Sequence, residues 1–165
     1  MIFVTVGTHE QQFNRLVKYM DELKSSGKIA EEVIIQTGYS TYEPQSCTWS
    51  DFFSYKQMEE HVKNARIVIT HGGPSSFIAP LRIGKVPIVV PRQSEFGEHV
   101  NDHQLGFCEA VQKRQGNILV VKDIINLGGV IADYDKLVAS MPAEIKSNNA
   151  KFCSELEKIV TDLCG

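Results

Sequence analysis

The most informative segment of this chain is Ile67-Val68-Ile69-Thr70-His71-Gly72-Gly73-Pro74-Ser75-Ser76. Its first four residues are β-branched, as in a strand that is buried on both faces of a parallel sheet. The two glycines allow a sharp turn, and the proline suits the first turn of a helix. The segment therefore predicts a buried strand that runs directly into a helix, which is the repeating unit of an α/β fold.

The same alternation extends along the chain on both sides of this segment. Further strands are predicted at 2–6, 33–36, 86–90 and 118–121, and helices at 13–23, 56–64, 74–83 and 98–113. Strands separated by helices form right-handed crossovers and a parallel sheet with helices on both faces. We therefore predict one doubly wound α/β domain over residues 1–165, with a last helix at about 143–163. Residues 38–54 are aromatic but irregular, and they are either a functional loop or a surface excursion.

Composition restricts the class of protein. The 165 residues suit one domain, and 42% hydrophobic with 22% charged residues is ordinary for a folded globular chain. The net charge of −3 argues against nucleic acid as the main partner. The four cysteines form no CxxC pair, which favours free thiols in a reducing compartment. The first apolar run is short and lacks a basic leader, so we expect a cytoplasmic chain that reaches a membrane only through a partner.

Candidate functional residues follow three of the predicted strands. In an open parallel sheet, ligands bind outside the carboxyl ends of the strands. The segments that converge there are Gly7-Thr8-His9, His71 to Ser76, and Arg92 to Gln104. A single site assembled from these three segments is therefore expected.

The turn at His71 to Ser76 has the features of a phosphate-binding site. Ser75 and Ser76 place hydroxyls and free backbone N–H groups at the N-terminus of a helix, where the helix dipole also favours negative charge. The alternative is a plain strand-to-helix turn in which serine caps the helix. The position of the turn at a strand end favours the phosphate interpretation.

Three motifs together resemble the C-terminal, donor-binding domain of family 28 glycosyltransferases, which have the GT-B fold. They are Thr70 to Ser76, then Gly84-Lys85-Val86-Pro87-Ile88-Val89-Val90-Pro91, then Asn101-Asp102-His103-Gln104. The opening Ile2-Phe3-Val4-Thr5-Val6-Gly7-Thr8 is similar to the start of that domain, so the resemblance covers about residues 2–121. Within the family, the chain looks most like the stand-alone subunits of bacterial capsule and exopolysaccharide synthesis. The resemblance implies that the chain folds as the Rossmann-like half of a GT-B enzyme.

The resemblance also implies a set of donor-binding residues. The turn at Gly7 and Thr8 would line the cleft near the donor phosphates. The diphosphate turn is matched by His71, Gly72, Gly73, Ser75 and Ser76. The segment that contacts the transferred sugar is matched by Asp102, His103 and Gln104, with Glu98 and His99 as an alternative register.

Five further residues are considered. Arg92 is a candidate to offset phosphate charge, and His9 is a candidate catalytic base at a helix start. His99 and His103 are spaced four apart as metal ligands can be, but no third ligand is evident, so we predict no metal. Ala79 departs from the family, because many relatives carry an acidic residue there that holds the ribose.

The expected function is that of the donor-binding catalytic subunit of a split inverting glycosyltransferase. The donor would be a UDP-sugar, with galactose first and glucuronic acid or N-acetylglucosamine next, and no other cofactor. A membrane-attached, acceptor-binding subunit would present a lipid-linked acceptor at the inner face of the membrane. Two alternatives stay open: a non-catalytic enhancer of a partner enzyme, and an unrelated nucleotide- or phosphate-binding enzyme.

Overall fold

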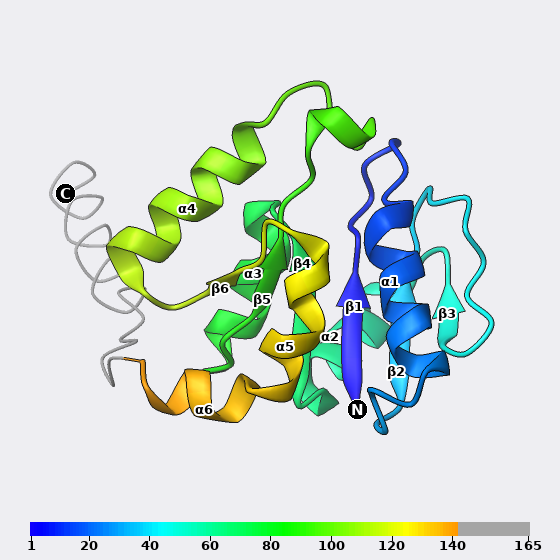
Figure 1. Ribbon diagram of the computed structural model, residues 1–165, viewed down its shortest axis with the longest axis horizontal. Helices are drawn as coiled ribbons and strands as arrows, with labels where there is room; N and C mark the ends of the chain where they lie inside the picture. Colours follow the sequence, from blue (N-terminus) through cyan, green and yellow to red (C-terminus); the bar gives the residue numbers. More distant parts are fainter. Residues whose placement is uncertain (142–165) are drawn as a thin grey trace, which may run out of the picture.

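Six parallel strands form the centre of the structure, a computed structural model that describes residues 1–141. Their order across the sheet is β3-β2-β1-β4-β5-β6 (Figure 1). The strands are β1 (Ile2–Thr5), β2 (Val33–Gln36), β3 (Thr48–Ser50), β4 (Ile67–His71), β5 (Ile88–Val90) and β6 (Leu119–Val120). This order is that of a Rossmann sheet, so the predicted doubly wound α/β fold is confirmed. The predicted helix at 143–163 lies outside the described residues.

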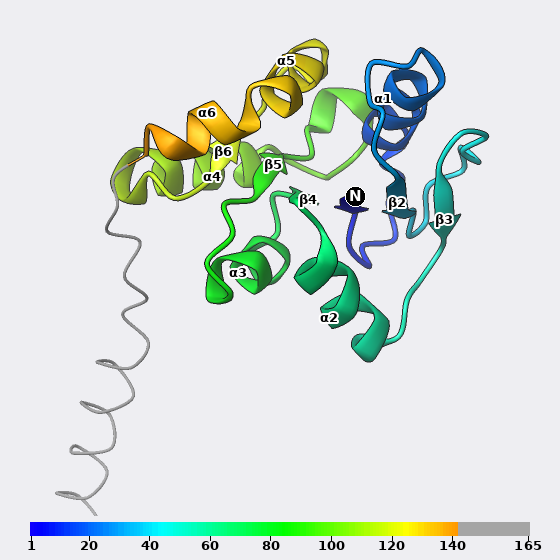
Figure 2. The ribbon, with the colours of Figure 1, turned by 90° about the horizontal axis from the view of Figure 1, so that it is seen from below.

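Helices cover both faces of the sheet (Figure 2). One face carries α1 (Asn14–Ser25), α5 (Leu127–Ala132) and α6 (Tyr134–Ala139), and the other carries α2 (Tyr55–Asn64), α3 (Pro74–Arg82) and α4 (His103–Gln115). Two short 3-10 helices, η1 (Ser94–Phe96) and η2 (Ile124–Asn126), lie in the connections after β5 and β6. The sheet is therefore buried between two layers of helices.

Strand β1 shows how the sequence fills both layers. Ile2 and Val4 pack into the core under α1, whereas Phe3 packs on the opposite face with Val62 of α2. All four residues of β1 are buried. Burial on both faces explains why the strands are continuous apolar runs without polar alternation.

Three parts of the described chain differ from the sequence-based expectation, and one of them is the pair of short helices α5 and α6, where no helix was predicted. Strand β3 was not predicted, because it has three residues and lies half exposed at the sheet edge, within the irregular segment 38–54. The helix predicted from residue 98 begins at His103. Gly97 has a φ of +65°, in the left-handed region, and this residue ends η1 and keeps the following residues out of a helix.

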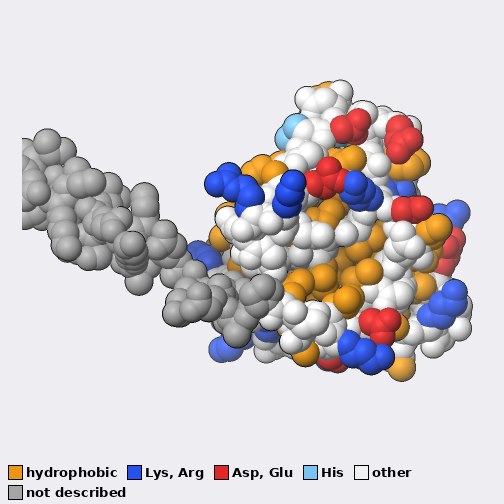
Figure 3. All heavy atoms as spheres, turned by 60° about the vertical axis from the view of Figure 1, so that its left-hand side comes forward, with side chains coloured by type: hydrophobic (Ala, Val, Ile, Leu, Met, Phe, Trp, Pro, Cys, Tyr) orange, Lys and Arg blue, Asp and Glu red, His pale blue; other side chains and the backbone are white. Residues whose placement is uncertain are grey.

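The edge of the sheet at β6 carries a half-buried apolar surface. Figure 3 shows apolar side chains gathered in the middle of this face, with basic and acidic side chains around them. Strand β6 and helices η2, α5 and α6 each contribute a half-buried apolar side chain that packs against the adjoining core. These side chains are Leu119, Ile124, Val130 and Val138. No helix among residues 1–141 combines the length and the apolar character that crossing a membrane requires.

Candidate functional site

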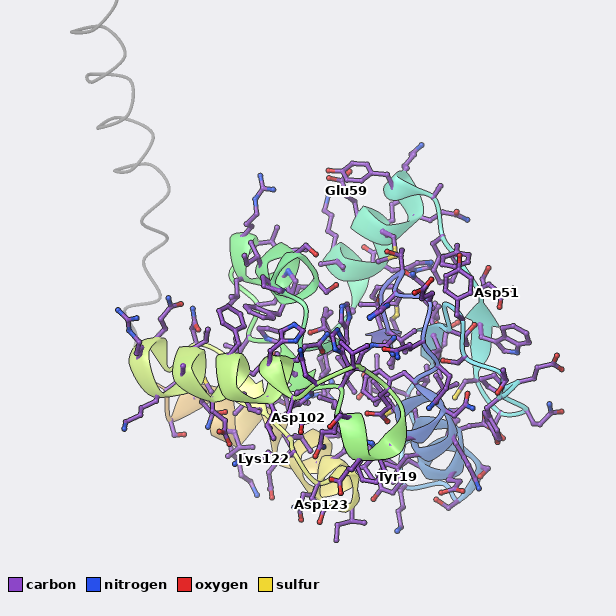
Figure 4. The ribbon with its side chains drawn as sticks, turned by 90° about the horizontal axis from the view of Figure 1, so that it is seen from above. Tyr19, Asp51, Glu59, Asp102, Lys122 and Asp123 are labelled. Atoms are coloured by element: carbon purple, nitrogen blue, oxygen red, sulfur yellow. The ribbon has the colours of Figure 1, made fainter. Side chains whose placement is uncertain are left out.

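A cleft of about 440 Å³ opens at the carboxyl edge of the sheet. Strands β1 and β4 are neighbours there, and the chain continues from them toward opposite edges of the sheet, which is where open α/β sheets bind ligands. Figure 4 looks onto this edge, with Asp51 at the end of β3 on one side and Asp102 at the start of α4 on the other. The cleft is lined by Thr5, Gly7, Thr8, His9, Gln36, Phe52, Phe53, Met58, His71, Ser75, Ser76 and Gln104.

One wall of the cleft is the N-terminus of α3. Gly73 is the N-cap residue and Pro74 the first helical residue, and no side chain caps this end of the helix. Ser75 and Ser76, in the first turn, both line the cleft. An uncapped N-terminus leaves backbone N–H groups without helical partners, so this wall favours an anion.

His71 fills the space between two glycine turns. It is 8% exposed, and its Nδ1 atom is buried without a hydrogen-bond partner. A Cβ atom on Gly73 would lie 2.3 Å from His71 Nε2, and one on Gly7 would lie 2.3 Å from His71 Cε1. Burial, assisted by the positive charge of Arg92, lowers the pKa of His71 to about 4. The ring is therefore neutral near pH 7, and it lines the cleft without bringing a positive charge.

The floor of the cleft is a buried polar network that sequence reasoning missed. Thr5 Oγ1 accepts a hydrogen bond from the Gly7 N–H (3.2 Å) and donates to Gln36 Oε1 (3.3 Å). Gln36 Nε2 donates to the Gly7 carbonyl (3.3 Å). These bonds hold Gly7 at a φ of +78°, a conformation that favours glycine. Polar residues at the ends of two apolar strands are the signal that could have identified this network.

The opposite wall is apolar. It is formed by Phe52 and Phe53, which follow β3, and by Met58 of α2. Phe53 packs against the rings of Phe3 and His61, with ring centroids 6.2 and 4.6 Å away. The aromatic end of the segment 38–54 is thus placed at the cleft, which the sequence alone left undecided.

Arg92 does not face the cleft, contrary to the expectation that it offsets phosphate charge. Its side chain is fully buried, and its guanidinium donates to the carbonyls of Val6, Gln11, Gln12 and Glu98 at 2.9 to 3.1 Å. Burial lowers its pKa to about 10. Arg92 therefore connects the loop after β1 to the loop after β5. Its guanidinium is directed at backbone carbonyls of the protein and not at the cleft.

Glu98 likewise does not reach the cleft. Its carboxylate is buried and pairs with both Arg15 Nε (2.8 Å) and Arg15 Nη2 (2.9 Å). It also accepts a hydrogen bond from the Gln93 N–H (3.0 Å). This ion pair joins α1 to the loop after β5, so sugar contacts from Glu98 are incompatible with the structure.

The other predicted residues divide between the cleft and its surroundings. Gly72 packs against the side chains of Gln104 and Cys108, where a Cβ atom would lie 2.9 and 3.0 Å from their nearest atoms. Asp102 accepts hydrogen bonds from the N–H and the hydroxyl of Ser94 (2.7 and 3.0 Å). Of the predicted set, the cleft is lined by Gly7, Thr8, His9, His71, Ser75, Ser76 and Gln104, and not by Gly72, Gly73, Arg92, Glu98, His99, Asp102 or His103.

Within residues 1–141, no group of three or more histidine, cysteine, aspartate or glutamate side chains is arranged to hold a metal ion.

The fold and the cleft define a Rossmann-like domain with an anion-receptive site at its switch point. The chain belongs to the glycosyltransferase family 28 C-terminal domain, whose family model matches residues 1–161. It is 30% identical over 158 residues to the human (Homo sapiens) protein called UDP-N-acetylglucosamine transferase subunit ALG13. That match covers 90% of this chain and 13% of the human protein.

Two solved structures share the fold. The crystal structure of the glycosyltransferase SnogD from Streptomyces nogalater gives a TM-score of 0.53 at 15% identity, over 99% of this chain and 43% of that one. The structure of the glycotransferase of kitacinnamycin gives a TM-score of 0.53 at 15% identity, over 84% of this chain and 37% of that one. The domain is therefore the Rossmann-like half of a GT-B glycosyltransferase fold.

Proposed function

We propose that this chain is the donor-binding catalytic subunit of a split glycosyltransferase and that its cleft holds a UDP-sugar. The observation that carries the proposal is the pairing of an apolar wall, Phe52 and Phe53, with the uncapped N-terminus of α3 in one cleft. A nucleoside diphosphate has the matching halves, a flat base and a doubly charged diphosphate. The base lies against the aromatic wall and the diphosphate at Ser75 and Ser76.

In this proposal, the chain stabilises the diphosphate as it leaves the sugar. Negative charge grows on the diphosphate during transfer, and preorganised donors aimed at that charge lower the barrier. The donors are the Ser75 N–H and the hydroxyls of Ser75 and Ser76, since Pro74 has no N–H and the Ser76 N–H donates to the Gly73 carbonyl (3.1 Å). Neutral His71 packs the Gly7 turn against the α3 turn, so it shapes the site and adds no charge.

The identity of the sugar and of the partner rests on resemblance. Galactose is the first proposed sugar, followed by glucuronic acid and N-acetylglucosamine, and transfer inverts the anomeric carbon. The human relative is named as a transferase subunit, which supports assembly with a second subunit. That partner would be attached to the inner face of the membrane and present a lipid-linked acceptor for capsule or exopolysaccharide synthesis. The enzyme would then lie on the cytoplasmic side.

Calorimetry on the isolated chain tests the proposal. UDP, uridine and the UDP derivatives of galactose, glucuronic acid and N-acetylglucosamine are titrated into the parent and into Ser76→Ala. Removing one hydrogen bond to a charged group costs about 1.5–3 kcal/mol, so we expect UDP to bind at least tenfold more weakly to the variant. Ser25→Ala, exposed at the last residue of α1, is the matched control and binds like the parent. Equal affinity for uridine and UDP would refute the diphosphate assignment, and no nucleotide binding at all would favour the enhancer alternative.

A further inference from the structure

The aromatic segment 38–54 supports one of its own residues at the cleft. Phe52, near the end of the segment, lines the cleft and is 45% exposed. Its ring lies edge to face against the ring of Tyr39, at 70° and with centroids 5.4 Å apart. Tyr39 belongs to the beginning of the segment, just after β2, and is itself half exposed. The orientation of the Phe52 ring therefore depends on Tyr39 and on the contacts that hold the chain around Tyr39.

The base of this segment is closed by the end of β2. The Gly38 N–H donates to the Asp51 carbonyl (2.9 Å), and Thr37 Oγ1 donates to Asp51 Oδ1 (3.1 Å). Asp51 is labelled at this end of β3 in Figure 4. The remainder of the segment, residues 40–46, is held instead by two polar side chains of α1.

The first of these side chains is Asn14, at the start of α1. Its Oδ1 accepts hydrogen bonds from the N–H groups of Thr41 (2.9 Å) and Tyr42 (3.1 Å). Its Nδ2 donates to Thr41 Oγ1 (2.8 Å). A side-chain amide that accepts and donates at once fixes both the distance and the orientation of its partners. Asn14 therefore fixes the path of the chain two residues beyond Tyr39.

The second side chain is Asp21, whose carboxylate is 4% exposed. Its Oδ2 accepts from the Tyr42 hydroxyl (2.9 Å) and the Gln45 N–H (3.0 Å), and its Oδ1 accepts from the Ser46 N–H (2.7 Å). Burial raises the pKa of Asp21, but these hydrogen bonds together outweigh burial and leave the pKa below its ordinary value. The carboxylate is therefore ionised near pH 7. Because a buried charge is costly unless its hydrogen bonds are made, Asp21 favours one path for this part of the segment.

We propose that Asn14 and Asp21 are positioning residues for nucleotide binding, which hold residues 40–46 so that Tyr39 supports the ring of Phe52 against the base. The inference rests on the proposed function, in which the base lies against the aromatic wall. Neither of the two α1 side chains lines the cleft. A ring that is already held in place loses less conformational entropy when a base stacks on it, so its support strengthens binding. The diphosphate contacts at α3 do not depend on this support.

A double-mutant cycle with UDP, measured by calorimetry on the full chain, tests this inference. Stacking of a base on an aromatic ring contributes about fivefold to 100-fold in affinity, so we expect Phe52→Ala to bind UDP at least tenfold more weakly than the parent. We expect Asn14→Ala to weaken binding at least fivefold in the parent but less than twofold in the Phe52→Ala background. A merely structural role of Asn14 would not depend on the Phe52 ring. Glu22→Ala, exposed on the same helix, is the matched control and binds UDP like the parent.

Two further variants run through the same cycle. We expect Asp21→Asn, which replaces one accepting oxygen by a donor, to behave like Asn14→Ala. Tyr39→Ala removes the exposed supporting ring without changing α1, and we expect the same dependence on Phe52, which keeps the test available if Asp21→Asn does not fold. Urea denaturation establishes that each variant used is folded.

The inference and the proposed function fail in different ways. Folded Asn14→Ala and Tyr39→Ala chains that bind UDP as tightly as the parent would overturn the inference. Losses of equal size with and without the Phe52 ring would overturn it as well, because the α1 side chains would then act by another route. A parent chain that binds no UDP would refute the proposed function instead.

Discussion

Replacing Gly73 by alanine probes the packing that shapes the cleft. The new Cβ atom would lie 2.3 Å from His71 Nε2, whereas ordinary contacts begin at about 3.4 Å, so the two groups must separate by roughly 1 Å. The backbone of Gly73, with φ −75° and ψ 127°, suits alanine. His71 cannot retreat freely, because its other side faces the Gly7 turn and the ring is 8% exposed. The cost therefore comes from overpacking against one buried ring.

Overpacking of a core costs about 1–3 kcal/mol, and alanine in place of glycine at an N-cap adds up to about 1 kcal/mol. We therefore expect the free energy of unfolding of Gly73→Ala, measured by urea denaturation, to fall by about 1–4 kcal/mol. In the His71→Ala background the same change should cost less than about 1 kcal/mol, because the obstructing ring is gone. Gly106→Ala, on α4 with no atom within 4 Å of the new Cβ, is the matched control and should stabilise the chain by about 0.5–1 kcal/mol.

The difference between the two backgrounds is the decisive quantity. If Gly73→Ala costs the same with and without the His71 ring, the steric explanation is wrong, and the glycine is required for another reason.

Three further changes test other contacts of the structure. Burial lowers the pKa of His71 from 6.5 to about 4, so the unfolded chain binds that proton more tightly and the free energy of unfolding falls by about 3 kcal/mol as the pH drops from 6.5 to 4. His71→Gln should flatten this part of the stability profile, and an unchanged slope would contradict the assignment. Lys85 Nζ donates to the carbonyls of Val62, Lys63 and Ala65 at the end of α2, so Lys85→Met should lower the free energy of unfolding by about 1–2 kcal/mol, against no change for Lys113→Met. Glu98→Gln removes the charge that pairs with Arg15 in a buried setting, and a loss of about 3 kcal/mol is expected by the same denaturation assay; a loss under about 1 kcal/mol would show that the pair does not join α1 to the loop after β5.

The fold could be predicted because its signals are local. Apolar runs such as Ile67 to Thr70 must be buried on both faces, and the glycines and proline that follow must turn the chain into a helix. Strand β3 was not predicted because it has no local signal of this kind. It has three residues, one of them exposed, and it is a strand because β2 offers it backbone partners.

The roles of charged residues could not be read from the sequence, because their partners are distant along the chain. Arg15 and Glu98 are 83 positions apart, and Arg92 binds carbonyls that lie up to 86 positions away. Nothing in the sequence of the segment 92–104 distinguishes a buried residue that connects two loops from a residue that contacts a ligand. The sheet brings the partners together, and only then is it evident that Arg92 and Glu98 are fully engaged.

The glycines of the α3 turn illustrate a different limit. From the sequence, Gly72 and Gly73 are explained by the close approach of a ligand. In the structure, that space is occupied by side chains of the chain itself, with the His71 ring against Gly73 and with Gln104 and Cys108 against Gly72. The glycines are needed for internal packing, and the anion-receptive groups are those of the following residues, Ser75 and Ser76.

Amide chemical-shift mapping during a titration with UDP tests most directly whether this cleft is the donor site. We expect the largest shifts on Gly7, Phe53, Ser75 and Ser76, which come from three separate segments and meet in the cleft. We expect uridine to shift Phe53 while leaving the two serines nearly unchanged, because only the diphosphate reaches the N-terminus of α3. Shifts confined to residues outside the cleft, or serine shifts of equal size with uridine and UDP, would contradict the assignment of this cleft as the donor site.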